Sequence, residues 1–248
     1  MRYFAELAYS GSSFHGWQKQ PNQVTVQTTL EKGLSTLWNT PMEIVGCGRT
    51  DAGVHASLYY AHFDTPKPIE DLEKFVFQWN ALIGYDIAIM NLIPVAKDAH
   101  ARFDAIQRSY SYYVHQFKNP FLKDRSFHYA PIFKASVEDL QQVGTLLMNY
   151  GSFYPFCKSN TQVHTMDCNL HRSEWIMEGD GRLVYKISAD RFLRGMVRMI
   201  VGACMNVALD KLDIEVVRNA MENQSRFDPA WSVPAQGLFL DEIRYPYF

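Results

Sequence analysis

The sequence predicts an α+β fold made of two halves, each with the element order β-α-β-β-α-β. Two observations support this prediction. Segments that alternate between apolar and polar residues, as strands do, are separated by segments whose apolar residues recur at helical spacing. The second half then repeats the element order of the first without obvious sequence identity. We therefore expect two mostly antiparallel sheets, each with its helices on one face, and a central cleft lined by the opposite faces.

The first half is expected to be a domain of residues 1–100. Its expected strands are Tyr3–Tyr9, Met42–Cys47, His55–Phe63 and Asp86–Val95. Its expected helices each carry one apolar face, the first through Val26, Leu30, Leu34 and Leu37, and the second, opened by Pro68, through Ile69, Leu72, Val76, Trp79 and Ile83. The segment between the first strand and the first helix is a long polar connection.

The second half is expected to be a domain of residues 101–248. Its expected strands are Gln107–Phe117, Cys168–Glu178, Arg182–Ala189 and Gln236–Tyr245, and the middle two form a hairpin across Gly179–Gly181. Ser136, with Asp139 three residues later, is typical of a capping box and predicts the start of a helix. Further helices are expected over Phe192–Leu209 and Asp213–Asn223.

Composition narrows the class of protein. The 248 residues suffice for two modest domains, and 47% of them are hydrophobic, so a large core is expected. The four cysteines form no CxxC pair, and Arg2 and Glu6 interrupt the apolar N-terminus, which favours a reducing, cytoplasmic location over secretion. The apolar stretch Met199–Leu209 is shorter than the roughly 20 residues that a bilayer requires, so no membrane association is expected.

The charge distribution leaves room for a nucleic-acid partner. The formal net charge is −2, which by itself argues against one. Residues 102–134, however, contain six basic and two acidic side chains, and residues 186–198 contain four basic and one acidic. These windows indicate a basic face on an acidic body, and a solvated surface of mixed charge fits them equally well.

The segment Gly46–Ala56, GCGRTDAGVHA, is the strongest candidate for chemistry. Its three glycines are expected to adopt positive φ angles and to let the backbone approach a ligand, while Arg49, Asp51 and His55 supply the charged and ionisable groups. Asp51 is either a reactive carboxylate tuned by its neighbour or a turn residue that binds its own backbone. The pair of Asp51 and His55 also fits a hydrolase, although His55 begins a predicted strand.

Other candidates come from scattered segments. His15, Trp17 and Lys19 lie in a polar loop, where they fit nucleotide binding or, for the tryptophan, filling of the core. Tyr110 and Tyr112 share a face of one strand near basic residues. Arg198 lies among apolar residues and needs a buried partner or a route to water. Cys157, His164, Cys168 and His171 do not match the usual zinc-ligand spacings, so no metal is expected.

Together these segments resemble a known family. The matching motifs follow one another along nearly the whole chain: HGWQKQ (15–20), GRTDAGVHA (48–56), ARFDA (101–105), RSYSY (108–112), FLRGMVRMIVG (192–202) and QGLFLDEIRYP (236–246). In this order they are similar to the signature of the tRNA pseudouridine synthases of the TruA family. The resemblance implies isomerisation of uridine to pseudouridine at positions 38, 39 and 40 of the tRNA anticodon stem-loop, by a homodimer that uses no cofactor.

The resemblance also implies roles for individual residues. Asp51 would be the initiating nucleophile, with attack on C1′, attack on the uracil ring and assistance of elimination all left open. Tyr110 would pack on the target uracil, and Arg198 would pair with Asp51. The residues implied to bind the substrate alongside Tyr110 are His15, Trp17, Lys19, Arg49, Arg102 and Leu238. A non-catalytic RNA-binding module and an aspartate-dependent hydrolase are the alternatives from other classes.

Overall fold

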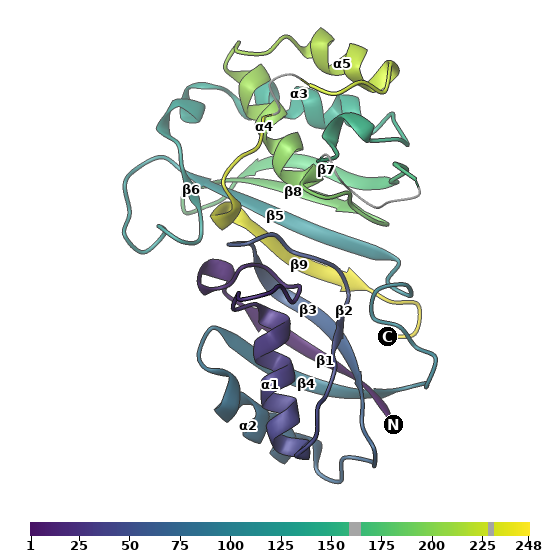
Figure 1. Ribbon diagram of the computed structural model, residues 1–248. Coiled ribbons are helices and arrows are strands. Elements are labelled where there is room, and N and C mark those ends of the chain that lie inside the picture. The colour runs from purple at the N-terminus through teal and green to yellow at the C-terminus, as the bar shows by residue number, and fades with distance from the viewer. Residues whose placement is uncertain (159–164, 228–230) are drawn as a thin grey trace. The chain divides into compact units, whose positions relative to one another are not determined.

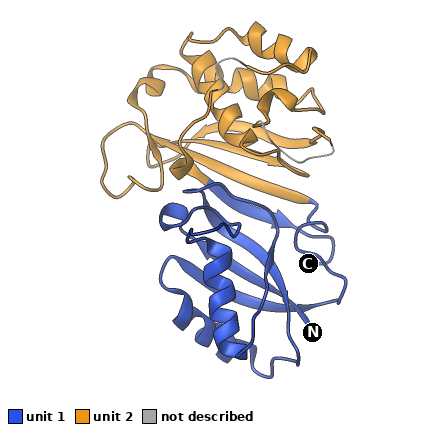
Figure 2. Ribbon diagram, in the orientation of Figure 1, with its two compact units in different colours: residues 1–106, 239–248 blue, residues 107–238 orange. Residues whose placement is uncertain are grey.

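The computed structural model describes residues 1–158, 165–227 and 231–248. The chain divides into two compact units, unit 1 with residues 1–106 and 239–248, and unit 2 with residues 107–238 (Figure 2). The end of the chain therefore packs with unit 1. The sequence-based division at residue 100 assigned this end to the second half, and it stays a prediction about domain organisation.

The sheet of unit 1 has the strand order β4 (Ile87–Val95), β1 (Arg2–Tyr9), β3 (His55–Asp64), β9 (Leu238–Arg244), and the short β2 (Val45–Gly46) pairs with β3. Strand β1 is antiparallel to both β3 and β4. Strand β9 runs parallel to β3 through His55 opposite Phe239. The expected mostly antiparallel arrangement is confirmed, and this parallel pair was not predicted.

The helices of unit 1 lie on one face of its sheet (Figure 1). Helix α1 (Val26–Trp38) begins at a capping box between Thr25 and Thr28. Helix α2 (Leu72–Ile83) begins at Asp71, whose carboxylate accepts a hydrogen bond from the Lys74 amide. The expectation that Pro68 opens this helix is wrong, because the cap three residues later sets the start. The buried core between the layers includes Leu30, Leu34, Phe63 and Trp79.

Part of the opposite face of the unit 1 sheet is covered by the end of the chain. The buried ring of Phe4 on β1 meets the edges of Tyr245, Tyr247 and Phe248, with centroid distances of 5.3, 6.2 and 5.9 Å. Tyr60 on β3 meets Tyr245 edge-on and packs against Phe248 at a tilt, with centroid distances of 5.4 Å for both pairs. Aromatic packing therefore closes this region of the face that we expected to line a cleft, and the cleft itself stays a prediction.

The sheet of unit 2 has the order β5 (Gln107–His115), β8 (Leu183–Ala189), β7 (Leu170–Met177), with antiparallel neighbours. The expected hairpin of β7 and β8 is confirmed. A short strand β6 (Phe127–His128), which was not predicted, pairs in parallel with β5. The unit also contains helix α3 (Val137–Leu147), helix α4 (Met196–Ala208) and helix α5 (Ile214–Glu222).

Capping explains where the helices of unit 2 begin. The Ser136–Asp139 capping box at the start of α3 is confirmed, with both reciprocal hydrogen bonds at 3.0 Å. Helix α4 was expected from Phe192 but begins at Met196, after Gly195 with φ of +73°. From α3, Gln141 bonds to the carbonyl of Ser173 and the amide of Trp175, which satisfies backbone groups on the edge strand β7.

Short 3-10 helices connect several elements: η1 (Gly11–Ser13), η2 (Ala130–Lys134), η3 (Tyr154–Phe156) and η4 (Ala235–Gly237). Among the residues that the structure describes, no helix combines the length and the apolar character needed to cross a membrane.

Candidate active site

The loop that joins β2 to β3 and carries Asp51 is fixed on both sides of this residue. On the N-terminal side, the Thr50 hydroxyl lies 2.8 Å from the hydroxyl of Tyr9, and the Thr50 carbonyl accepts a hydrogen bond from the amide of Trp17 at 3.2 Å. On the C-terminal side, the amide of Val54 donates to the carbonyl of Asp51 at 3.1 Å and closes a turn. The side chain of Asp51 is half-buried and that of Arg49 is exposed. The backbone of Asp51 is therefore held in place by the contacts of its neighbours Thr50 and Val54.

The glycines of this loop serve close packing more than unusual backbone angles. Only Gly53 has a positive φ, +78°, so the expectation of positive φ is wrong for Gly46 and Gly48. At Gly46 a Cβ atom would lie 2.1 Å from the hydroxyl of Tyr59 and 2.5 Å from the ring of Trp17. The absence of a side chain at Gly46 is what lets these two aromatic residues pack beneath the loop.

Trp17, which we expected to bind the substrate, lies inside this packing. Its side chain is 2% exposed and stacks on Tyr59 with a centroid distance of 4.1 Å. The hydroxyl of Tyr59 donates to the carbonyl of Gly48 at 2.6 Å, and burial raises the pKa of Tyr59 well above its usual value, so that this donor keeps its proton. Burial favours the alternative interpretation, in which Trp17 fills the core and supports the loop.

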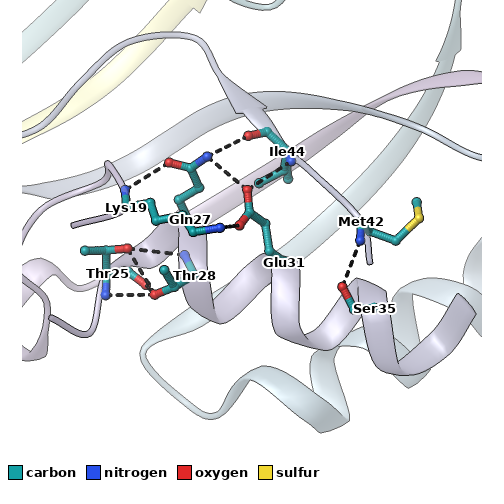
Figure 3. A network of polar contacts seen from close by, with 8 residues as sticks. All are labelled: Lys19, Thr25, Gln27, Thr28, Glu31, Ser35, Met42 and Ile44. Atoms are coloured by element: carbon teal, nitrogen blue, oxygen red, sulfur yellow. Dashed lines mark hydrogen bonds and ion pairs between the residues drawn. The ribbon is translucent and has the colours of Figure 1, made fainter. Parts of the chain in front are cut away.

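A polar network fastens the segment around Lys19 to α1 and to the chain entering β2 (Figure 3). The side-chain amide of Gln27 donates to the carbonyl of Ile44 at 3.1 Å and to the carboxylate of Glu31 at 3.0 Å, and its oxygen accepts from the amide of Lys19 at 3.0 Å. The ammonium of Lys19 pairs with the buried Glu31 at 3.3 Å, while its side chain stays 64% exposed. Lys19 thus has an anchored backbone and a charge within reach of solvent.

His15 and Arg102 are exposed candidates on separate segments of unit 1. The amide of His15 donates to the carbonyl of Val24 at 2.9 Å, which leaves the imidazole at the surface. The guanidinium of Arg102 lies 5.6 Å from the ring centroid of Phe103. The structure therefore places Arg102 in a different segment from the loop around Asp51.

The segment that carries Arg102 is held by buried groups. The amide of Ala101 donates to Nδ1 of His62 at 3.1 Å, and the carbonyl of Ala101 accepts from the hydroxyl of Tyr245 at 2.6 Å. Burial, together with the charge of Arg2, lowers the pKa of His62 to about 4, so its imidazole is neutral at pH 7 and can accept this hydrogen bond.

His55 is buried and acts within the core of unit 1. Its Nδ1 accepts a hydrogen bond from the amide of Gly11 at 3.1 Å, and its ring stacks on Phe239 at 4.4 Å. These contacts occupy the imidazole with the packing of β3 against β9 and η1. They favour a structural role over general base catalysis in a hydrolase.

The candidates of unit 2 lie on β5 and α4. Tyr110 is half-buried, and its ring meets the edge of Phe192 at 5.2 Å and 88°. Tyr112 is fully buried and donates its hydroxyl to the carbonyl of Pro234. In the first turn of α4, Nε of Arg198 donates to the carbonyl of Val233 at 2.7 Å. Of the two tyrosines, Tyr110 is the less buried.

The remaining candidate residues are divided between the two units. Leu238, at the start of β9, is buried. Asp51 and Arg49 belong to unit 1, whereas Tyr110 and Arg198 belong to unit 2, so the pairing of Asp51 with Arg198 stays a prediction. The residues that sequence reasoning missed are Tyr9, Gln27, Glu31 and Tyr59, which hold the loops in place.

The histidines and cysteines of the considered zinc site do not form a cluster in the part of the chain that the structure describes. His164 lies outside the described residues. Burial raises the pKa of Cys168 to about 12, so its thiol keeps its proton, and Nδ1 of His171 lies 3.0 Å from the side-chain oxygen of Gln107. Among the described residues, no three His, Cys, Asp or Glu side chains form a group able to hold a metal ion.

The sequence of this chain is similar to those of known proteins. Residues 150–246 match the family model described as tRNA pseudouridine synthase. The chain is 44% identical to tRNA pseudouridine synthase A of Parabacteroides distasonis over 99% of this chain and 96% of that protein. It is 32% identical to tRNA pseudouridine synthase A of Bacillus subtilis over 99% of both chains. The chain belongs to the tRNA pseudouridine synthase A family.

Membership in the tRNA pseudouridine synthase A family confirms the resemblance drawn from the motifs. It also confirms the expectation of an enzyme, an isomerase, over a non-catalytic module or a hydrolase. The family model covers the segments with Arg198 and Leu238, and the full-length relatives extend the match over the loop with Asp51. The roles of the individual residues stay predictions.

Proposed function

We propose that this protein isomerises uridine to pseudouridine in tRNA at positions 38, 39 and 40 of the anticodon stem-loop. The observation that carries the proposal is the construction of the loop around Asp51. Hydrogen bonds to the carbonyls of Thr50 and Asp51 fix the backbone on both sides, and the half-buried carboxylate lies two residues from the exposed Arg49. A carboxylate held in this way is preorganised to meet a substrate.

The chemistry requires one carboxylate at the sugar. Breaking the bond between N1 of uracil and C1′ develops positive charge on the ribose, which Asp51 stabilises or traps. The uracil then turns, C5 bonds to C1′, C5 loses its proton and N1 gains one. All heavy atoms of the substrate are retained, so the reaction needs no co-reactant.

Neighbouring side chains have distinct tasks in this proposal. Tyr110 packs on the uracil, and the positive charge of Arg198 pairs with the carboxylate of Asp51. A base inside a stem leaves its stack at a cost of a few kcal/mol. Arg49 assists by contacting the RNA at the position that the base leaves. His15, Lys19, Arg102 and Leu238 complete the substrate contacts as the resemblance implies.

The assembly is part of the same proposal. Two domains, residues 1–100 and 101–248, line a central RNA-binding cleft, and two chains form a homodimer that works in the cytoplasm. The full-length match to relatives named tRNA pseudouridine synthase A supports the tRNA substrate, and the motif resemblance supports the positions and the dimer.

The experiment is to incubate the protein with unmodified tRNA transcripts and to map pseudouridine along each transcript. We expect the product at positions 38 to 40 in tRNAs that carry uridine there. Product at other positions alone contradicts the assignment of the stem-loop. Binding without any product supports an RNA-binding module, and release of free uracil supports a hydrolase.

A further inference from the structure

The loop of residues 116–126, between β5 and β6 of unit 2, is a second surface with chemistry suited to RNA. Its two ends are fixed, because β5 and β6 pair in parallel with Val114 opposite Phe127 and His115 opposite His128. The amide of Tyr129 also donates to the carbonyl of His115 at 3.1 Å. In Figure 1 this teal loop leaves the sheet of unit 2 beside β6. It projects from an anchored base.

Hydrogen bonds within the loop shape its tip. The side-chain oxygen of Asn119 accepts from the amide of Phe121 at 2.9 Å, and the amide of Arg125 donates to the carbonyl of Leu122 at 3.0 Å. The resulting turns leave the rings of Phe117 and Phe121 in solvent, 75% and 88% exposed. Apolar rings held in water by a structured turn gain from contact with a partner.

The charges around these rings are mostly positive. Lys118, Lys123 and Arg125 are exposed, and Asp124 is the acidic residue of the loop. In the described part of the chain, none of the three cations has an ion-pair partner. They are therefore available to an external anion, and their place in the same loop as two exposed rings is typical of surfaces that contact phosphates and unstacked bases together.

We propose that the loop of residues 116–126 contacts the tRNA, with Phe117 and Phe121 stacking on bases and the cations meeting phosphates. This inference rests on the proposed tRNA substrate. A protein partner fits the loop less well, because three cations would lose water in an interface whose core usually excludes charge. RNA offers bases that can stack on the two rings and phosphates that can pair with the three cations.

A second exposed aromatic region provides the contrast. Phe77 on α2 is also 75% exposed, but the acidic residues Glu70, Asp71, Glu73 and Asp86 lie near it in the sequence and outnumber its basic neighbours Lys67 and Lys74. Negative charge at this position disfavours an approach by RNA. Phe77→Ala is therefore the matched control for a ring of similar exposure.

The first test measures binding of unmodified tRNA transcripts and steady-state kinetics for the wild type, Phe121→Ala, Phe121→Tyr and Phe77→Ala. We expect Phe121→Ala to raise the Kd and the KM for tRNA roughly tenfold, with kcat at saturating tRNA unchanged, because stacking contributes to binding. Phe121→Tyr, which keeps the ring, and Phe77→Ala should both match the wild type. Equal melting temperatures check that the folds are intact.

The second test addresses the charges. Lys123→Gln combined with Arg125→Gln should lower the slope of log Kd against log salt by about 1 to 2. The reason is that binding releases fewer counterions when two phosphate contacts are missing. Lys67→Gln combined with Lys74→Gln, which removes two cations near Phe77, should leave the slope unchanged. An equal slope change in both double variants would overturn the assignment of the phosphates to this loop.

Two further results would overturn the proposal, and a third would separate it from the proposed function. Wild-type tRNA affinity in Phe121→Ala would overturn the proposal, as would sedimentation of Phe121→Ala as a smaller species than the wild type, which would make the loop a protein interface. If the wild type binds tRNA through this loop but forms no pseudouridine, the proposed function fails and this inference stands.

Discussion

At the scale of single residues, the structure shows which aromatic side chains pack in the core and which remain candidates for substrate contact. Trp17 and Tyr110 were both candidates for base contact. Trp17 is stacked on Tyr59 beneath the loop around Asp51, whereas Tyr110 on β5 is only half-buried. A tryptophan in a polar loop fits both roles, and nothing in its neighbours along the chain reveals that Tyr59 lies against it.

Tyr110 should respond differently to loss of its ring and loss of its hydroxyl. If the ring stacks on uracil, Tyr110→Ala loses roughly 1 to 3 kcal/mol of binding free energy. If the hydroxyl also removes the C5 proton, Tyr110→Phe binds normally and stalls before the final product. Measured tRNA affinity and pseudouridine yield distinguish these variants, and rates near that of the wild type for both would remove Tyr110 from the site.

His62 makes the stability of the protein depend on pH. Its pKa is about 4 in the folded protein and near 6.5 when exposed, so the unfolded chain binds the extra proton between these values. The free energy of unfolding should therefore fall by up to about 3 kcal/mol as the pH drops from about 6.5 to about 4. Denaturant unfolding across this range measures the fall. In His62→Gln the pH dependence should be shallower, and an unchanged slope would contradict the role of His62.

At the scale of elements, local patterns predicted most strands and helices, whereas their partners depended on tertiary contacts. The Ser136 capping box and the β7–β8 hairpin were predictable because both are set by neighbours in sequence. The parallel pairing of β9 with β3 joins residues far apart in the chain, and β6 is too short for a periodic signal. Helix α2 begins later than Pro68 suggested because Asp71 provides a better cap.

The loop between β2 and β3 yields a matched pair of glycine variants. In Gly46→Ala the new Cβ atom would meet the hydroxyl of Tyr59 and the ring of Trp17, so we expect the free energy of unfolding to drop by about 1 to 3 kcal/mol. In Gly48→Ala the Cβ atom meets nothing within 4 Å, so stability should stay within about 0.5 kcal/mol. Thermal unfolding compares the two, and equal melting temperatures would show that the packing beneath the loop is not restrictive.

At the scale of the whole molecule, the motifs identified the family and the candidate residues, because the short segments that carry the candidate residues have a recognisable sequence pattern. The supporting contacts of Gln27 and Glu31 could not be predicted, since a glutamine and a glutamate on an amphipathic helix ordinarily face solvent. The basic window at residues 102–134 includes the cations of the loop at 116–126, but their exposure beside two exposed rings is apparent only from the structure.

The proposed homodimer is testable in solution. An anticodon arm together with the body of a tRNA is too long for one small basic face, so we expect two chains to share the substrate. Sedimentation at assay concentrations should show a dimer, and tRNA binding should weaken steeply with salt as counterions are released. A fully active monomer would contradict the dimer.

The most direct test of the account is pseudouridine mapping in tRNA treated with Asp51→Asn. This variant keeps the size of the side chain and loses its charge and its nucleophile. We predict no pseudouridine, with melting temperature and tRNA affinity close to those of the wild type, because the backbone of the loop is held by contacts at Thr50 and Val54. Measurable turnover by Asp51→Asn, after deamidation to aspartate has been excluded by mass spectrometry, would contradict the proposed role of the carboxylate.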